Sequence, residues 1–212
     1  MSKAILITAV LSLLVNCGGG GTNTTPLPPM EQQPDADVQQ LPLPVTTPHL
    51  LTDEIEPQQA IADMTIGINL GNTFDAPHEG DWALPAQQSF ILAFKEAGFK
   101  HIRIPVTWDL HTQSAYPYEI EMSFLNRVEQ VIDWALAEDL YVIVNAHHES
   151  WLKEDFQNQQ TRNRFDKIWM QIAAHFKTKP AKLMFEFLNE PNGMTIAGVN
   201  QLNKRVLAII RN

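Results

Sequence analysis

Residues 101–146 contain the stretch that decides the fold. It begins with HIRIP (101–105) and ends with LYVIVNA (140–146), two short apolar runs typical of buried β-strands. Between them, SFLNRVEQVIDWALA (123–137) repeats apolar side chains every three or four positions, which predicts an amphipathic helix that Ser123 can cap. Two strands joined by a helix predict a parallel βαβ unit.

The same alternation continues on both sides of this unit, from residue 53 onward. Apolar runs and apolar periodicity predict further strands at 64–70 and 183–188 and further helices at 85–97, 165–176 and 199–210. Near-continuous apolar strands that alternate with helices indicate an α/β fold with a parallel sheet covered by helices. A doubly wound sheet and a (β/α)8 barrel both fit this order.

The glycines near the first strand weaken the doubly wound, nucleotide-binding alternative. Gly67 and Gly71 flank Asn69 and do not form the G-x-G-x-x-G pattern that cradles a pyrophosphate.

The amino-acid composition excludes other classes of protein. A net charge of -9 with 15 Lys+Arg argues against a nucleic-acid binder. The single cysteine, Cys17, excludes an intramolecular disulfide framework and a two-cysteine zinc site.

Polar residues gather where the predicted strands end. In a barrel of parallel strands, the carboxyl ends of the strands carry the chemistry. Four successive strands of this chain deliver polar groups there, which is more than packing requires. The segments are Asn69 to Asn72, Arg103 to Trp108, Asn145 to Glu149 and Asn189 to Pro191.

Two of these strand ends suggest acid–base chemistry. Glu190 is a candidate general acid/base, a role that needs a raised pKa, and Asn189 offers an amide to a substrate hydroxyl. Arg103 would point into the barrel if its two isoleucine neighbours face the helices. Its charge then needs a carboxylate partner, which is either Glu186 as structural support or a catalytic carboxylate.

The histidines and tryptophans favour a carbohydrate over a metal. Side chains of adjacent strand residues diverge, so His147 and His148 are not expected to share a metal, and hydrogen bonds to sugar hydroxyls suit them better. Trp82, Trp108 and Trp151 fall in predicted loops, where their rings could stack on sugars or pack against the loop.

Four segments together resemble family 5 glycoside hydrolases, and bacterial endo-β-1,4-glucanases among them. They are GINLGNTFDA (67–76), HIRIPVTW (101–108), IVNAHHESW (143–151) and FEFLNEP (185–191). The resemblance implies a (β/α)8 barrel, retention of anomeric configuration, no cofactor, and a β-glucan such as cellulose, xyloglucan or mixed-linkage glucan as the partner.

The resemblance also implies a role for individual residues. Glu190 is the acid/base, Asn189 binds the 2-hydroxyl at the cleaved sugar, and Arg103 holds the nucleophile. His147 belongs to the catalytic rim. The residues expected to contact substrate are His148, Trp108, Asn72, Asp75 and Trp151.

One part of the family's machinery has no counterpart in this chain. Retaining hydrolysis needs a second carboxylate about 5–5.5 Å from the first, and the family places it on the seventh strand. We therefore expect residues 53–212 to be the N-terminal half of the barrel, from a fragment or a natural truncation. The 212-residue chain by itself is then expected to be inactive.

Other functions remain open at this point. A non-catalytic carbohydrate-binding half-barrel would keep the polar strand ends but need no nucleophile. A β-mannanase or β-glucosidase of the same family would differ in its substrate contacts, and an unrelated βα enzyme would use a metal.

The N-terminal residues predict export. Residues 1–17 combine Lys3 with an apolar run too short to cross a bilayer as a helix, as in a signal peptide. Leu14 to Cys17 resembles a bacterial lipobox, which implies lipidation of Cys17, a membrane contact through that anchor only, and an outer-membrane or cell-surface location. A plain secretory signal that releases an extracellular protein and an uncleaved anchor are the alternatives.

A linker is expected between the signal peptide and the barrel. Residues 18–52 hold seven of the fourteen prolines and no Lys, Arg or aromatic residue, which predicts a disordered, extended tether.

Overall fold

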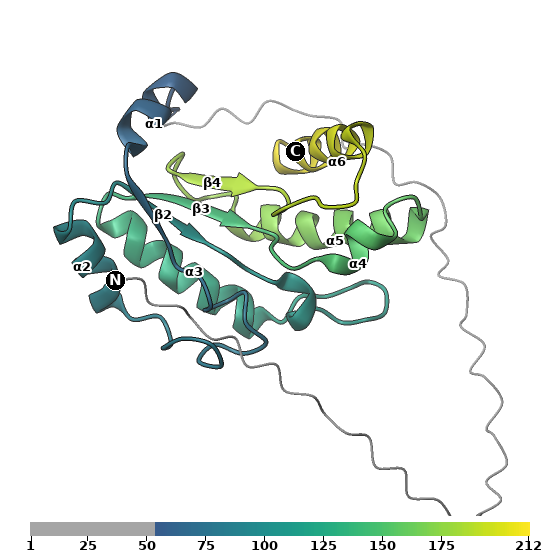
Figure 1. Ribbon diagram of the computed structural model, residues 1–212, viewed down its shortest axis with the longest axis horizontal. Helices are drawn as coiled ribbons and strands as arrows, with labels where there is room; N and C mark the ends of the chain where they lie inside the picture. The colour runs from purple at the N-terminus through teal and green to yellow at the C-terminus, as the bar shows by residue number, and fades with distance from the viewer. Residues whose placement is uncertain (1–53) are drawn as a thin grey trace, which may run out of the picture. The chain divides into compact units, whose positions relative to one another are not determined.

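The computed structural model describes residues 54–212, so the predicted signal peptide, Cys17 and the linker at 18–52 lie outside the described residues. Four strands form one sheet, part of which Figure 1 shows as arrows that lie side by side. Their bounds are β1 (Gly67–Asn69), β2 (His101–Ile104), β3 (Tyr141–Asn145) and β4 (Leu183–Glu186).

The order of the strands decides between the two architectures that the sequence left open. The sheet order is β1-β2-β3-β4, and every neighbouring pair is parallel. Strands therefore follow one another in space as they do in the chain, whereas a doubly wound sheet reverses its order at a switch point. Successive parallel strands with helices between them are the arrangement of a (β/α)8 barrel, and the described residues contain four of its strands.

Six α-helices and one 3-10 helix accompany the sheet within residues 54–212. Four α-helices, namely α2, α3, α5 and α6, follow strands near the predicted places, although α5 starts six residues earlier than expected. The last of the four, α6, lies beside α5. The sequence patterns did not predict α1, α4 or the 3-10 turn η1. The bounds are α1 (Pro57–Met64), α2 (Gln88–Glu96), η1 (Trp108–His111), α3 (Met122–Ala137), α4 (Ser150–Glu154), α5 (Gln159–Phe176) and α6 (Ile196–Ile210).

The starts of α3 and α2 also differ from the sequence predictions. Ser123 lies inside α3, and Glu121 occupies the N-cap without a side-chain bond. Helix α2 begins after Pro85, at Gln88. By contrast, Gly98 ends α2 as predicted, with a positive φ of 93° that a glycine adopts without a steric cost.

The core lies between the sheet and the helices. Figure 1 shows α3 and α5 along one face of the sheet. On that side Ile102 and Ile104 of β2 are fully buried, while Arg103 between them is partly exposed on the other face. The prediction that Arg103 points away from the helices is therefore confirmed. Among residues 54–212, no helix is both long and apolar enough to cross a membrane.

Candidate active site

Arg103 is the centre of the polar network at the strand ends. Its Nε donates to Oε2 of Glu186 at 2.7 Å, and its Nη2 donates to Oε1 of the same carboxylate at 2.6 Å. This paired geometry matches a planar guanidinium to a planar carboxylate. The Arg103 guanidinium lowers the pKa of Glu186, so Glu186 is ionised at neutral pH. Of the two partners considered for Arg103, Glu186 is the one that it binds among the described residues.

The same guanidinium also binds two asparagines. Nη1 donates to Oδ1 of Asn69 at 3.1 Å, and Nη2 donates to Oδ1 of Asn189 at 2.9 Å. The ends of β1, β2 and β4 therefore meet at one cation. Because the amide oxygen of Asn189 accepts from Arg103, the N–H₂ end of the amide is the end that can serve a substrate hydroxyl.

Backbone hydrogen bonds hold the loops that carry these residues. The ladder continues beyond the strands: the N–H of Leu70 donates to Arg103 O at 2.8 Å, and the N–H of His147 donates to Val106 O at 2.8 Å. The N–H of Asn189 donates to Ala146 O at 2.9 Å. The polar side chains are therefore placed by the sheet rather than by free loops.

Glu190 lies at the same rim and is exposed. The hydrogen-bonded Glu186 carboxylate, and more weakly the carboxylate of Glu190, raise the pKa of Arg103. The backbone of Glu190 has a φ of 42°, in the left-handed region that costs a non-glycine residue roughly 1 kcal/mol. This strained position could not be predicted from the sequence, because no glycine stands there.

Asn145 connects the ends of β2, β3 and β4. Its side chain is fully buried, and its Oδ1 accepts the N–H of Val106 at 3.2 Å. Its Nδ2 lies 3.1 Å from Oε1 of Glu186 and 3.1 Å from Nδ1 of His147. The sequence showed Asn145 as a polar residue within an apolar run, but it did not show these partners.

His147 and His148 do not diverge, which corrects the sequence prediction. The chain leaves the strand after Asn145, and the two rings meet with centroids 4.5 Å apart at 73°. Alternation of side chains holds only inside a strand. Asp75 joins the pair: one possible ligand atom from each of the three residues lies within 4.8 Å of the other two. These are the described residues that could together approach a cation.

The other residues predicted to contact substrate differ in how deeply they are buried. Asp75 is buried and accepts the N–H of Thr73 at 2.8 Å, whereas Asn72 is exposed with a φ of 61°. Trp82 is 53% exposed, and its ring lies 6.2 Å from the His148 ring. An exposed aromatic ring therefore stands beside the histidine pair.

Trp108 is fully buried, which corrects its prediction as a residue of the substrate groove. A ring with no exposed surface cannot stack on a sugar. Its indole N–H instead donates to the backbone oxygen of Asn145 at 2.9 Å, and its ring packs edge-on against Phe124. Trp108 thus supports the site from behind.

Glu149 is a buried carboxylate whose role the sequence did not reveal. Its Oε1 accepts the backbone N–H of Trp108 at 3.1 Å, and its Oε2 accepts the indole N–H of Trp151 at 3.0 Å. Neither donor carries a positive charge. Burial, assisted by the nearby negative charge of Asp109, raises the pKa of Glu149 to about 7.

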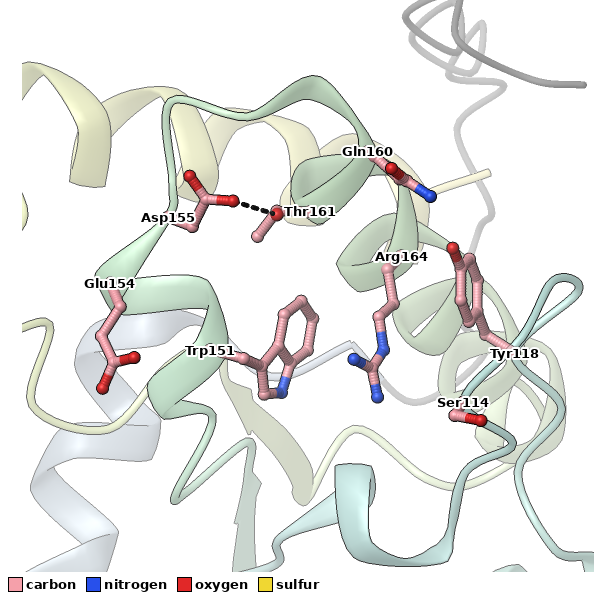
Figure 2. Close-up of a pocket in the computed structure, with 8 residues that line it drawn as sticks. All are labelled: Ser114, Tyr118, Trp151, Glu154, Asp155, Gln160, Thr161 and Arg164. Atoms are coloured by element: carbon pink, nitrogen blue, oxygen red, sulfur yellow. Dashed lines mark hydrogen bonds between the residues drawn. The ribbon is translucent and has the colours of Figure 1, made fainter. Parts of the chain in front are cut away.

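Trp151 lines a pocket of about 390 Å³ that Figure 2 shows. The Arg164 guanidinium lies 4.4 Å from the Trp151 ring and 5.6 Å from the Tyr118 ring, and it forms an ion pair with Asp109. Asp155 accepts from Thr161 at 3.2 Å (Figure 2). Several polar groups of the pocket are thus bonded to the protein itself. Among the described residues, Trp151 is the one predicted substrate contact that lines it.

Comparison with known proteins supports this architecture. The family model described as cellulase (glycosyl hydrolase family 5) matches residues 63–212. Endoglucanase H of Acetivibrio thermocellus is 46% identical over 167 residues, which are 78% of this chain and 18% of that protein. Endoglucanase B of Paenibacillus lautus is 40% identical over 171 residues, 73% of this chain and 30% of that protein.

Solved structures of glucanases also match the fold of this chain. Thermotoga maritima Cel5A in complex with mannotriose has a TM-score of 0.69 and 39% identity, over 74% of this chain and 50% of that one. A subfamily 4 endo-β-1,4-glucanase from Bacillus licheniformis with cellotetraose has a TM-score of 0.70 and 46% identity, over 74% of this chain and 32% of that one. The chain spans half or less of the length of these relatives.

Proposed function

The chain belongs to glycosyl hydrolase family 5, and from this membership we propose that it carries the acid/base half of a retaining β-1,4-glucanase. The observation that carries the proposal is the Arg103 network, which binds Glu186 and Asn189, the residue directly before Glu190. It fixes the Asn189–Glu190 segment where the strand ends converge.

In this proposal Glu190 first protonates the glycosidic oxygen as the leaving sugar departs. It then removes a proton from the water that releases the sugar from the enzyme. The N–H₂ group of Asn189 donates to the 2-hydroxyl, a contact that strengthens in the transition state. Exposure of Glu190 allows the substrate to reach it.

The nucleophile of this mechanism is proposed to lie outside these 212 residues. Glu186 is the carboxylate nearest to Glu190 in the chain, but it suits the role poorly. Both of its oxygens accept from Arg103, and Oε1 also accepts from Asn145. Each of its oxygens therefore has a partner within the protein, which fits the role of structural support that the sequence offered for Glu186.

We propose a β-1,4-glucan as substrate, because the named relatives are endoglucanases and one is seen with cellotetraose. The proposed contacts are His147, His148, Asn72, Asp75 and Trp151, with Trp82 as the exposed ring beside His148. A second candidate is a β-1,4-mannan, favoured by the mannotriose complex of Thermotoga maritima Cel5A.

Hydrolysis of soluble β-1,4-glucan tests the proposal. The protein expressed from its full coding sequence should cleave the polymer with retention, and Glu190→Gln should reduce turnover by roughly a hundredfold or more, the usual size of acid–base catalysis. Glu96→Gln, at an exposed glutamate of α2, is the matched control. Turnover of Glu190→Gln equal to that of the control would refute the role of Glu190. Parallel assays on mannan decide between the two substrates.

We also propose export and anchoring through a lipid on Cys17, supported by the signal-like residues 1–17 and the lipobox-like sequence before Cys17. Fractionation of cells tests this. The wild-type protein should sediment with membranes, and Cys17→Ala should move it to the soluble exported fraction. An unchanged membrane fraction would contradict lipidation at Cys17.

A further inference from the structure

The buried amide of Asn145 has its orientation fixed by its partners. The N–H of Val106 can only donate, so the atom that faces it at 3.2 Å must be the amide oxygen. The Glu186 carboxylate can only accept when ionised, so the atom facing it at 3.1 Å must be the amide nitrogen. A flipped amide would place two donors together and two acceptors together inside the protein, and buried polar groups do not tolerate this.

This orientation determines the proton position on His147. The amide nitrogen that faces Glu186 also lies 3.1 Å from Nδ1 of His147, and it has only N–H donors to offer. Nδ1 of His147 must therefore accept, so it carries no proton. A neutral imidazole with a bare Nδ1 carries its proton on Nε2.

The surroundings keep the ring neutral. Burial, followed by the His148 ring, lowers the pKa of His147. The charged groups around the ring have opposing effects on its pKa: Asp75 and Glu186 favour the imidazolium, and Arg103 opposes it. At neutral pH the ring is therefore an N–H donor at one nitrogen and an acceptor at the other.

We propose that Asn145 is a positioning residue that holds His147 in the Nε2–H tautomer and braces Glu186 against Arg103 with the same amide group. His147 then offers the substrate a hydrogen-bond donor rather than a lone pair, which suits a sugar oxygen. This inference rests on the proposed function for the identity of the ligand, but the tautomer itself is a property of the chain.

The tautomer also bears on the trio of Asp75, His147 and His148. A metal binds an imidazole through an unprotonated nitrogen. In His147 the unprotonated nitrogen, Nδ1, already accepts from Asn145. Its lone pair is therefore not free for a cation, although the distances among Asp75, His147 and His148 would allow one to bind.

Long-range ¹⁵N–¹H NMR of the full chain labelled in histidine tests the proposal, with His147→Gln used to assign the signal. His147 of the wild type should give the pattern of the Nε2–H tautomer. A wild-type ring with its proton on Nδ1 would overturn the proposal, and this outcome needs no variant to fold.

Asn145→Asp sharpens the test because it keeps the shape of the side chain but places an accepting oxygen against Nδ1. The new oxygen also faces Oε1 of Glu186, so a proton is favoured between the acceptors. The fraction of His147 protonated at Nδ1 should rise by roughly tenfold or more, as a hydrogen bond to a charged group can produce. Asn69→Asp is the control, since Asn69 binds Arg103 at 3.1 Å through its oxygen and shares the network. It should leave the His147 tautomer unchanged.

The same tautomer ratio in the wild type and in folded Asn145→Asp would overturn the role of Asn145. Absence of glucan cleavage by the complete protein would instead refute the proposed function, while the His147 spectrum would be unaffected by that result.

Discussion

Glu186 and Glu149 lie at the carboxyl ends of neighbouring strands, yet their surroundings have opposite effects. Glu186 is partly exposed and pairs with the Arg103 guanidinium, which lowers its pKa. Glu149 is fully buried and accepts from two neutral N–H groups, and burial raises its pKa to about 7. A nearby cation therefore decides which of the two carboxylates keeps its charge.

Trp108 joins the two environments. Its backbone N–H binds Glu149, and its indole N–H binds the backbone of Asn145, whose side chain binds Glu186. Glu186, which pairs with Arg103, belongs to the proposed active site. Glu149, which accepts from neutral N–H groups, belongs to the layer of buried residues that supports the site. Substitutions can test each side of this comparison.

The largest effect is expected from removing the Trp108 side chain, which connects the surroundings of the two glutamates. Trp108→Ala should destabilise the chain by about 4 kcal/mol, because it empties a fully buried site and leaves an acceptor on Asn145 without its indole partner. Urea unfolding measures this loss. Trp82→Ala is the matched control at a ring that is 53% exposed, and it should cost less than about 1 kcal/mol. Similar losses in both variants would contradict the burial assigned to Trp108.

The next effect concerns Glu149 and pH. A carboxyl group whose pKa is raised on folding stabilises the protein fully below its unfolded pKa, near 4.5, and loses this contribution as pH rises to about 7. Stability should therefore fall by up to about 3 kcal/mol across this window because of Glu149. Glu149→Gln, compared with the wild type by unfolding at several pH values, should lack this fall. An identical slope in both proteins would show that Glu149 does not titrate there.

The smallest effect has the opposite sign and comes from Glu186. Its lowered pKa adds stability above the unfolded pKa, and this contribution disappears as pH falls through the folded pKa. Because the pair is 24% and 32% exposed, we expect only about 1 kcal/mol. Glu186→Gln should flatten the acid side of the stability curve and leave the fall from pH 4.5 to 7 in place. A change confined to the window above pH 4.5 would contradict the pairing.

Much of the fold was predictable from local patterns. Apolar runs and helical periodicity gave the four strands and the helices after them, and the alternation around Arg103 gave its direction correctly. Helix starts were less accurate, as at Ser123, because a possible cap in the sequence does not show which residue leaves the helical conformation first.

The members of the site were predictable from the sequence, and Glu186 was one of the two partners expected for Arg103, but the other contacts were not predictable. The polar strand ends pointed to Arg103, Asn189 and Glu190, and the structure brings them to one rim. Trp108 was misplaced because a tryptophan in a loop can turn toward solvent or toward the core, and only the packing around Phe124 decides which. The burial of Glu149 could not be predicted from the sequence, because a glutamate that follows two histidines is expected to be exposed to solvent.

The sequence by itself determined the order of strands and helices and which face of each strand is apolar, because both depend on side chains close together in the chain. Only the tertiary structure decided the partners. Arg103 and Glu186 are 83 positions apart, and they meet because the parallel register sets β2 beside β3 and β3 beside β4. The same register places the Asn145 amide against His147 and Glu186, and burial then fixes the charge on Glu149. Hydrogen-bond partners and charge states are properties of a position in space, and local sequence patterns carry no record of them.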